Sequence, residues 1–146
     1  MFDKEIIKLV EGKEGYLNNL CTSLYNKKFI NLPEKLTHLY FPSNSRFNQP
    51  IDDLPFGTKY LSITGDFNYP IDNLPNSIKY LILNGVFNQP VNCLPDSITS
   101  LDLGGCFNQP INCLPNLITY LHIGGKFNQP IDNLPSSILK LSINGE

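Results

Sequence analysis

The sequence predicts a mainly β fold, a parallel β solenoid of about six coils, each of about 20–22 residues, with a small N-terminal α-helical cap. Three observations predict it. A Phe-Asn word recurs at a constant spacing, a short alternating apolar stretch ends each unit, and a glycine follows that stretch. Repetition at a fixed short period is typical of solenoids, in which each unit packs only on its neighbours. We expect the solenoid to cover residues 31–146 and the cap to cover residues 1–30.

The Phe-Asn word predicts two columns of stacked side chains. An earlier, degenerate unit at 32–41 reaches its phenylalanine two residues late, which indicates one longer turn. We expect the phenylalanines to form a buried spine and the asparagines to bond backbone groups at the corner as a structural ladder. The two columns are Phe47, Phe67, Phe87, Phe107 and Phe127, and Asn48, Asn68, Asn88, Asn108 and Asn128.

The end of each unit predicts a short strand. In the unit that begins at Phe67, the stretch 81–83 reads Leu-Ile-Leu, in a region where apolar positions alternate, as in a strand with one buried face. Pro70 and Pro75 exclude an interior strand or a helix from the rest of the unit. Gly85 then predicts a turn with positive φ. Stacked units would place their strands side by side in a parallel sheet, about 4.8 Å apart.

The two ends depart from the repeat. Phe2, Ile6 and Leu9 follow helical spacing, as do Tyr16 and Leu20, so we expect two short helices that cap the first coil or dock a partner. At the other end, "LSINGE" stops with a strand and its glycine. An open strand edge invites pairing, so a homodimer through this C-terminal edge is a further expectation.

Composition excludes several classes of function. The net charge is −2 with 11 Lys and Arg in no basic stripe, so we expect no nucleic-acid partner. No apolar run approaches about 18 residues, and the N-terminus lacks a signal peptide's apolar core, so we expect no membrane partner and a cytoplasmic location. We expect no cofactor and no metal, because the cysteines lack Cys-x-x-Cys spacing; these are Cys21, Cys93, Cys106 and Cys113.

The outward positions of the strands are the candidate binding site. They vary between units while the apolar positions hold, and tyrosine suits protein recognition because it is large, rigid and polar at its tip. The alternative is that these tyrosines only cover the sheet. Ser100, Asp102 and His122 are the residue types of a catalytic triad, but a flat face offers no pocket, so no catalytic residue is expected. The candidate binding residues are Tyr60, Tyr80, Tyr120, Ser62, Ile82, Asp102, His122 and Lys140.

The unit at 127–145, "FNQPIDNLPSSILKLSING", resembles the FNIP repeat, a short relative of the leucine-rich repeat. The resemblance covers residues 47–146 fully and implies a leucine-rich-repeat-like solenoid of slime-mould or giant-virus type, in the host cytoplasm if viral. Some such proteins carry an F-box, but the non-repeat segment here is shorter than that domain. We therefore expect a non-enzymatic module that binds an unidentified protein. The alternatives are a substrate-recruiting adaptor of a ubiquitin ligase and a structural protein that self-assembles through its open C-terminal coil.

Overall fold

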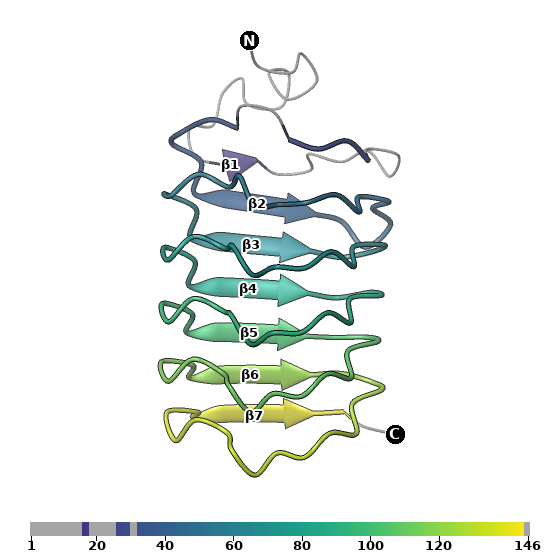
Figure 1. Cartoon of the computed structure of the whole chain (residues 1–146), viewed down its shortest axis with the longest axis vertical. Coiled ribbons are helices and arrows are strands. Elements are labelled where there is room, and N and C mark those ends of the chain that lie inside the picture. Colours follow the sequence, from purple (N-terminus) through teal and green to yellow (C-terminus); the bar gives the residue numbers. More distant parts are fainter. Residues whose placement is uncertain (1–15, 18–25, 30–31, 145–146) are drawn as a thin grey trace.

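A computed structural model describes residues 16–17, 26–29 and 32–144 of the chain. The described strands form one sheet in which all neighbours are parallel and follow each other in chain order (Figure 1). The predicted parallel β solenoid is confirmed, with about five turns of roughly 20 residues per coil. The strands are β1 (Tyr16–Leu17), β2 (His38–Phe41), β3 (Tyr60–Ile63), β4 (Tyr80–Leu83), β5 (Ser100–Leu103), β6 (Tyr120–Ile123) and β7 (Lys140–Ile143).

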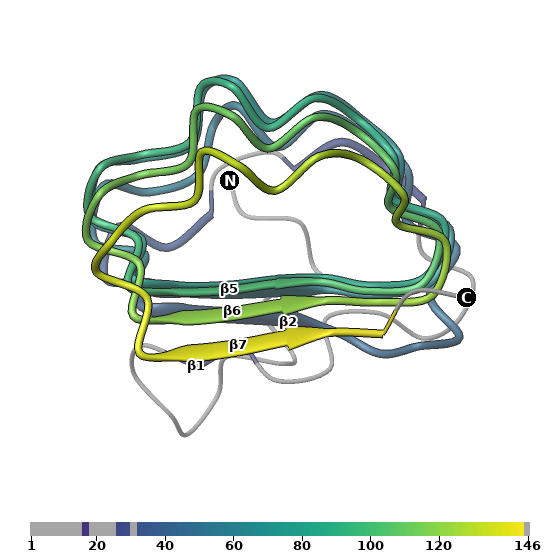
Figure 2. The same ribbon diagram turned by 90° about the horizontal axis from the view of Figure 1, so that it is seen from below.

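The strands pair residue for residue, which gives each position of the repeat its own column. Tyr60 pairs with Tyr80, and Tyr80 pairs with Ser100, so the offset between paired residues stays the same from coil to coil. Between β1 and β3 the offset is slightly longer, because Tyr16 pairs with His38 and His38 with Tyr60. Figure 2 looks along the stack and shows the coils superposed, with the strands on one side and the proline-containing returns on the other.

The core lies between the strands and the returns. Along each central strand the second and fourth residues are fully buried, as Leu81 and Leu83 are in β4. The phenylalanines of the repeated word are buried in one file: neighbouring ring centroids lie 6.0–6.2 Å apart, with the planes 4–9° from parallel. Such regular stacking follows from the constant offset, because each coil is close to a translated copy of the coil before it.

The coils approach closely at the glycine turns. Gly85 has a φ of 87°, and a Cβ on this residue would lie 2.2 Å from the carbonyl oxygen of Gly65. The Val86 N–H donates to that same oxygen at 3.1 Å. A side chain would therefore separate the coils where they are hydrogen-bonded, so glycine is required by both its φ and its space.

The helical cap was predicted over residues 1–30, of which the structure describes 16–17 and 26–29. Tyr16 and Leu17 are extended and pair with β2, so the helix predicted through them is wrong at these two residues. The unpaired N–H and C=O groups along an edge strand favour such pairing. Phe29 is buried, and its ring lies 5.0 Å from that of Phe47. The rest of the predicted cap lies outside the described residues.

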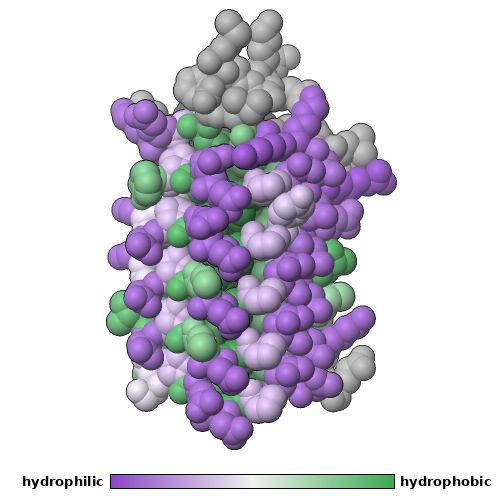
Figure 3. Space-filling view, viewed as in Figure 1, coloured by the Kyte–Doolittle hydropathy of each residue, from purple (hydrophilic) through white to green (hydrophobic). Residues whose placement is uncertain are grey.

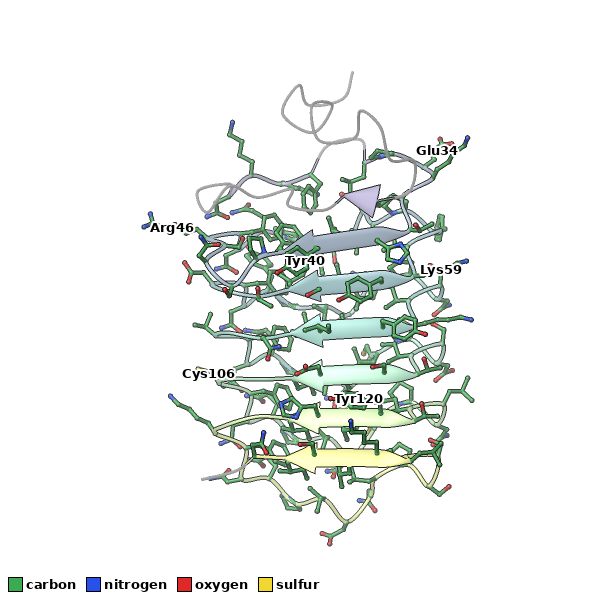
Figure 4. All side chains as sticks on the ribbon, turned by 180° about the vertical axis from the view of Figure 1, so that it is seen from behind. Glu34, Tyr40, Arg46, Lys59, Cys106 and Tyr120 are labelled. Carbon is green, nitrogen blue, oxygen red and sulfur yellow. The ribbon has the colours of Figure 1, made fainter. Side chains whose placement is uncertain are left out.

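Within residues 16–17, 26–29 and 32–144 there is no helix long and apolar enough to cross a membrane. The side of the molecule that carries the returns is largely hydrophilic. On it, hydrophobic side chains stand apart from one another among polar ones (Figure 3). The opposite side is formed by the strands, which lie in front in Figure 4.

Candidate functional site

The candidate site is the strand face, which we define as the outward side chains of β2 to β7. It has two columns, because the first and third residues of each strand point away from the core. Figure 4 shows Tyr40 and Tyr120 on this face, with Lys59 at one margin and Cys106 at the other. The first column is His38, Tyr60, Tyr80, Ser100, Tyr120 and Lys140, and the second is Tyr40, Ser62, Ile82, Asp102, His122 and Ser142.

Aromatic rings line most of the first column. The ring centroids of His38 and Tyr60 are 5.6 Å apart, and those of Tyr60 and Tyr80 are 6.3 Å apart. Tyr80 is 49% exposed. Further along the column, the Lys140 Nζ lies 5.3 Å from the centroid of the Tyr120 ring. The structure therefore brings the predicted tyrosines and lysine together into one row, interrupted only at Ser100.

Ser62 is not an accessible part of this face. It was predicted as a binding residue, but it is only 2% exposed. The register places it between Tyr40 and Ile82, whose side chains are far larger than a hydroxymethyl group. The alternation of the strand was predicted from the sequence, whereas this shielding depends on which side chains stand beside the serine on the neighbouring strands.

Asp102 stands beside His122 in the second column, and the pKa of its carboxyl is shifted. Burial raises the pKa of the Asp102 carboxyl, while the charge of His122 and a hydrogen bond from Asn84 act in the opposite direction. One oxygen, Oδ1, is buried and has no hydrogen-bond partner. None of the residues Ser100, Asp102 and His122 lines either of the cavities described on this chain.

The asparagine column is a hydrogen-bonded ladder. In each coil the asparagine N–H donates to the side-chain Oδ1 of the asparagine one coil earlier, at 2.8–3.0 Å from Asn68 to Asn128. Asn26 provides the first rung, since its Oδ1 accepts from the Asn48 N–H at 2.9 Å. Sequence reasoning missed this rung. The available signal was the pair Tyr25-Asn26, a degenerate Phe-Asn word one coil before the first recognised one.

Sequence reasoning also missed an exposed aromatic residue on another side of the molecule. Phe56 is 92% exposed and adjoins a cavity of about 610 Å³ that Phe29, Leu32 and Leu54 also line. A salt bridge joins the Lys28 Nζ to a carboxylate oxygen of Asp53, 3.0 Å away, beside this cavity. The available signal in the sequence was that the equivalent position is polar in the other units, where it holds Asn76, Asp96, Asn116 and Ser136.

The described cysteines are free thiols. Cys93 and Cys113 are exposed, and Cys106 is half-buried. In the part of the chain that the structure describes, no group of three or more His, Cys, Asp and Glu side chains is placed to hold a metal ion.

Comparisons with known proteins agree with this architecture. A family model for the FNIP repeat matches residues 47–84, 67–106, 87–116 and 107–145. Among solved structures, the chain is similar to the crystal structure of CroV588, a giant-virus protein described as a novel circular LRR (leucine-rich repeat) protein structure. The TM-score is 0.69, with 41% identity over 77% of this chain, and the chain spans 18% of the length of that protein. A search of the curated proteins found no match.

Proposed function

Because the chain belongs to the FNIP repeat family, whose LRR-like solenoids are typical of binding modules, we propose that it binds another protein through its strand face. The observation that carries this proposal is the aromatic row. The Tyr60 and Tyr80 rings pack against each other at a tilt of 37°, beside the half-buried side chain of Ile82, in the middle of the sheet. Interface centres are enriched in such aromatic residues, which contribute contact area at a small cost in side-chain entropy.

The difference in variability between inward and outward columns supports the same proposal. The inward columns keep apolar residues from coil to coil, as at Leu81, Leu101 and Leu121, while the outward columns change from Tyr to Ser and from Ile to Asp. Packing therefore does not dictate the outward residues. A rigid sheet that presents dissimilar side chains at fixed spacing suits recognition of a folded protein surface or an extended segment.

The experiment is an affinity capture followed by calorimetry with the captured protein. The test variant changes Tyr60, Tyr80 and Tyr120 together to Ser, and the control variant changes Phe56 and Leu117, exposed apolar residues off the strand face, to Ser. We expect the test variant to lose the partner and the control to keep it, with unchanged circular dichroism in both. A partner that binds the triple variant with wild-type affinity would refute the proposal.

A second candidate function is self-association through the edge of β7. Leu141 and Ile131 occupy core columns yet are each almost half exposed in this coil. We propose that a second copy of the chain covers them, which buries apolar area and pairs the edge of β7 that has no partner among the described residues. Light scattering over a hundredfold concentration range should show a mass that rises, and Leu141→Lys should keep the chain monomeric. A monomer mass at all concentrations would exclude this candidate.

A further inference from the structure

Cys93 and Cys113 stand at the same place of consecutive coils, and both thiols are exposed. The same column holds Asp53, Asn73 and Asn133 in other coils, so no packing requirement selects cysteine here. We propose that these two thiols form a two-coordinate site for a soft monovalent metal ion, Cu(I), which bridges two coils of the solenoid. The expectation of no metal rested on the absence of Cys-x-x-Cys spacing, which is a criterion for a zinc site, whereas a two-coordinate Cu(I) site needs only two thiolates.

Hydrogen bonds on both sides hold the coils in register around the two cysteines. Before them, the Asn108 N–H donates to the Asn88 Oδ1 at 2.8 Å. After them, the Thr119 N–H donates to the Thr99 carbonyl oxygen at 2.8 Å. The constant offset of the coils is therefore held through this part of the chain, and the two cysteines are direct neighbours along the stack.

Side chains on this corner reach from one coil to the next. The Asn73 Nδ2 donates to the Asp52 Oδ1 at 3.2 Å, and these residues belong to the cysteine column and the column beside it. Six residues earlier in each coil, the Phe87 and Phe107 rings are 6.2 Å apart with an interplanar angle of 4°, so the two coils are related there by a translation of about that length. Two exposed thiols displaced by such a translation can turn toward each other.

The spacing favours a metal bridge over a disulfide. A disulfide needs Cβ atoms about 3.5–4.5 Å apart, which is shorter than the translation of the coils. A sulfur–metal–sulfur bridge spans about 4.6 Å, twice a metal–sulfur bond of about 2.3 Å, and the two side chains can reach this span by rotation about χ1. Soft thiolates select Cu(I) over hard cations. On binding, each thiol loses one proton to the buffer, and Cu(I) exchanges two labile ligands for two sulfurs without a change of oxidation state.

The test is an anaerobic titration of the reduced full chain with Cu(I) in competition with a chromogenic chelator. The starting variant carries Cys21→Ser and Cys106→Ser, so that only the proposed pair remains. We expect this variant to bind one Cu(I) per chain with release of two protons. Adding Cys93→Ser or Cys113→Ser should weaken binding by about 100-fold or more, because the second thiolate then no longer acts within the same molecule.

Comparing the two-thiol variant with its single-thiol derivatives distinguishes a paired site from copper binding to independent thiols. If Cys93→Ser retains full affinity, or if the starting variant binds no more tightly than either single-thiol form, the proposal is wrong. Native mass spectrometry of the loaded chain should give a monomer with one copper. A copper-bridged dimer at low micromolar protein would likewise overturn the assignment to one chain.

Discussion

The central coils and the last coil contain the same residue types in the same columns, yet they differ in burial. Leu121 is fully buried and Ile111 is 1% exposed, whereas Leu141 and Ile131, one coil later, are 44% and 45% exposed. The strands β6 and β7 pair in the same register as those before them. Among the described residues, the coil of β6 has a neighbouring coil on each side and the coil of β7 has one on a single side, which accounts for the difference.

This comparison shows that each coil obtains its burial from the coil on either side. The energy of such a stack is approximately a sum of unit and nearest-neighbour terms. A substitution in a central column should then disturb two interfaces, while the same substitution in the last coil should disturb one.

Leu101→Ala and Leu141→Ala remove the same atoms from the two environments. We expect Leu101→Ala to lower the free energy of unfolding by about 2–5 kcal/mol, because it leaves a cavity among fully buried neighbours. Leu141→Ala should cost less than about 1 kcal/mol, because solvent already reaches that side chain. Urea denaturation followed by circular dichroism measures both, and equal losses would contradict the nearest-neighbour account.

Gly85→Ala tests the close approach of the coils themselves. The added methyl group would meet the Gly65 oxygen at 2.2 Å and would also hold a residue with a side chain at positive φ. We expect a loss of about 2–3 kcal/mol in unfolding free energy. Gly57→Ala is the control, since its nearest contact would be 3.4 Å from the Leu36 oxygen. Chemical denaturation should leave that variant within about 0.5 kcal/mol of wild type, and a similar loss at both sites would exclude the coil-contact explanation.

Asn88→Ala breaks the ladder in a central coil, where two donors of the following coil depend on the Asn88 side chain. The Asn88 Oδ1 accepts from the Asn108 N–H and from the Gln109 Nε2. Removing it should cost about 1–3 kcal/mol, because a half-buried backbone N–H loses its partner. In the described part of the chain, the Asn128 Oδ1 accepts only from Gln129, so Asn128→Ala should cost less. Thermal unfolding of the two variants gives the comparison, and hydrogen exchange at the Asn108 amide locates the effect.

Much of the fold could be predicted because the same pattern of apolar residues, prolines and glycine occurs five times in the sequence. Alternation around Leu81, the prolines of the return and the glycine after each strand lead independently to one coil. The beginning of the solenoid could not be predicted in this way. The rung at Asn26 and the buried Phe29 lie in a unit that keeps the asparagine but replaces the usual phenylalanine and proline.

The candidate site was predicted less completely for a related reason. A period of two assigns each strand residue to a face, and it placed Tyr60, Tyr80 and Ile82 together on the outward side. It does not give accessibility, which depends on the size of side chains from other coils. Ser62 points outward but is covered, and Phe56 is exposed although it is apolar. Both results arise from neighbours that are distant in the sequence.

Thr58→Val tests an exception to the rule that central columns are apolar. Thr58 occupies the column of Leu36 and Ile78, is fully buried, and its hydroxyl has no hydrogen-bond partner. We expect valine to raise the free energy of unfolding by about 1 kcal/mol, because an unpaired buried hydroxyl is removed with little change of shape. Ser45→Ala is the control of opposite sign, because the Ser45 Oγ accepts from the Phe47 N–H at 3.1 Å. Differential scanning calorimetry should show one melting temperature rising and the other falling.

Asp102→Asn tests whether a partly buried charge on the outward face makes the free energy of unfolding depend on pH. Burial raises the pKa of the Asp102 carboxyl, so the folded chain holds this proton to higher pH than the unfolded chain does. Below the ordinary aspartate pKa of about 3.9 both states are protonated, and the variant should match wild type. As the pH rises above this value, wild type loses stability relative to Asp102→Asn, because only wild type must bury a charge. Denaturation should be measured between pH 3 and pH 7 at intervals of about one pH unit. The stability advantage of the variant should grow with pH and then level off. A gap independent of pH would mean that burial is cancelled by His122 and Asn84, and one that favours wild type at neutral pH would mean that these two residues outweigh burial.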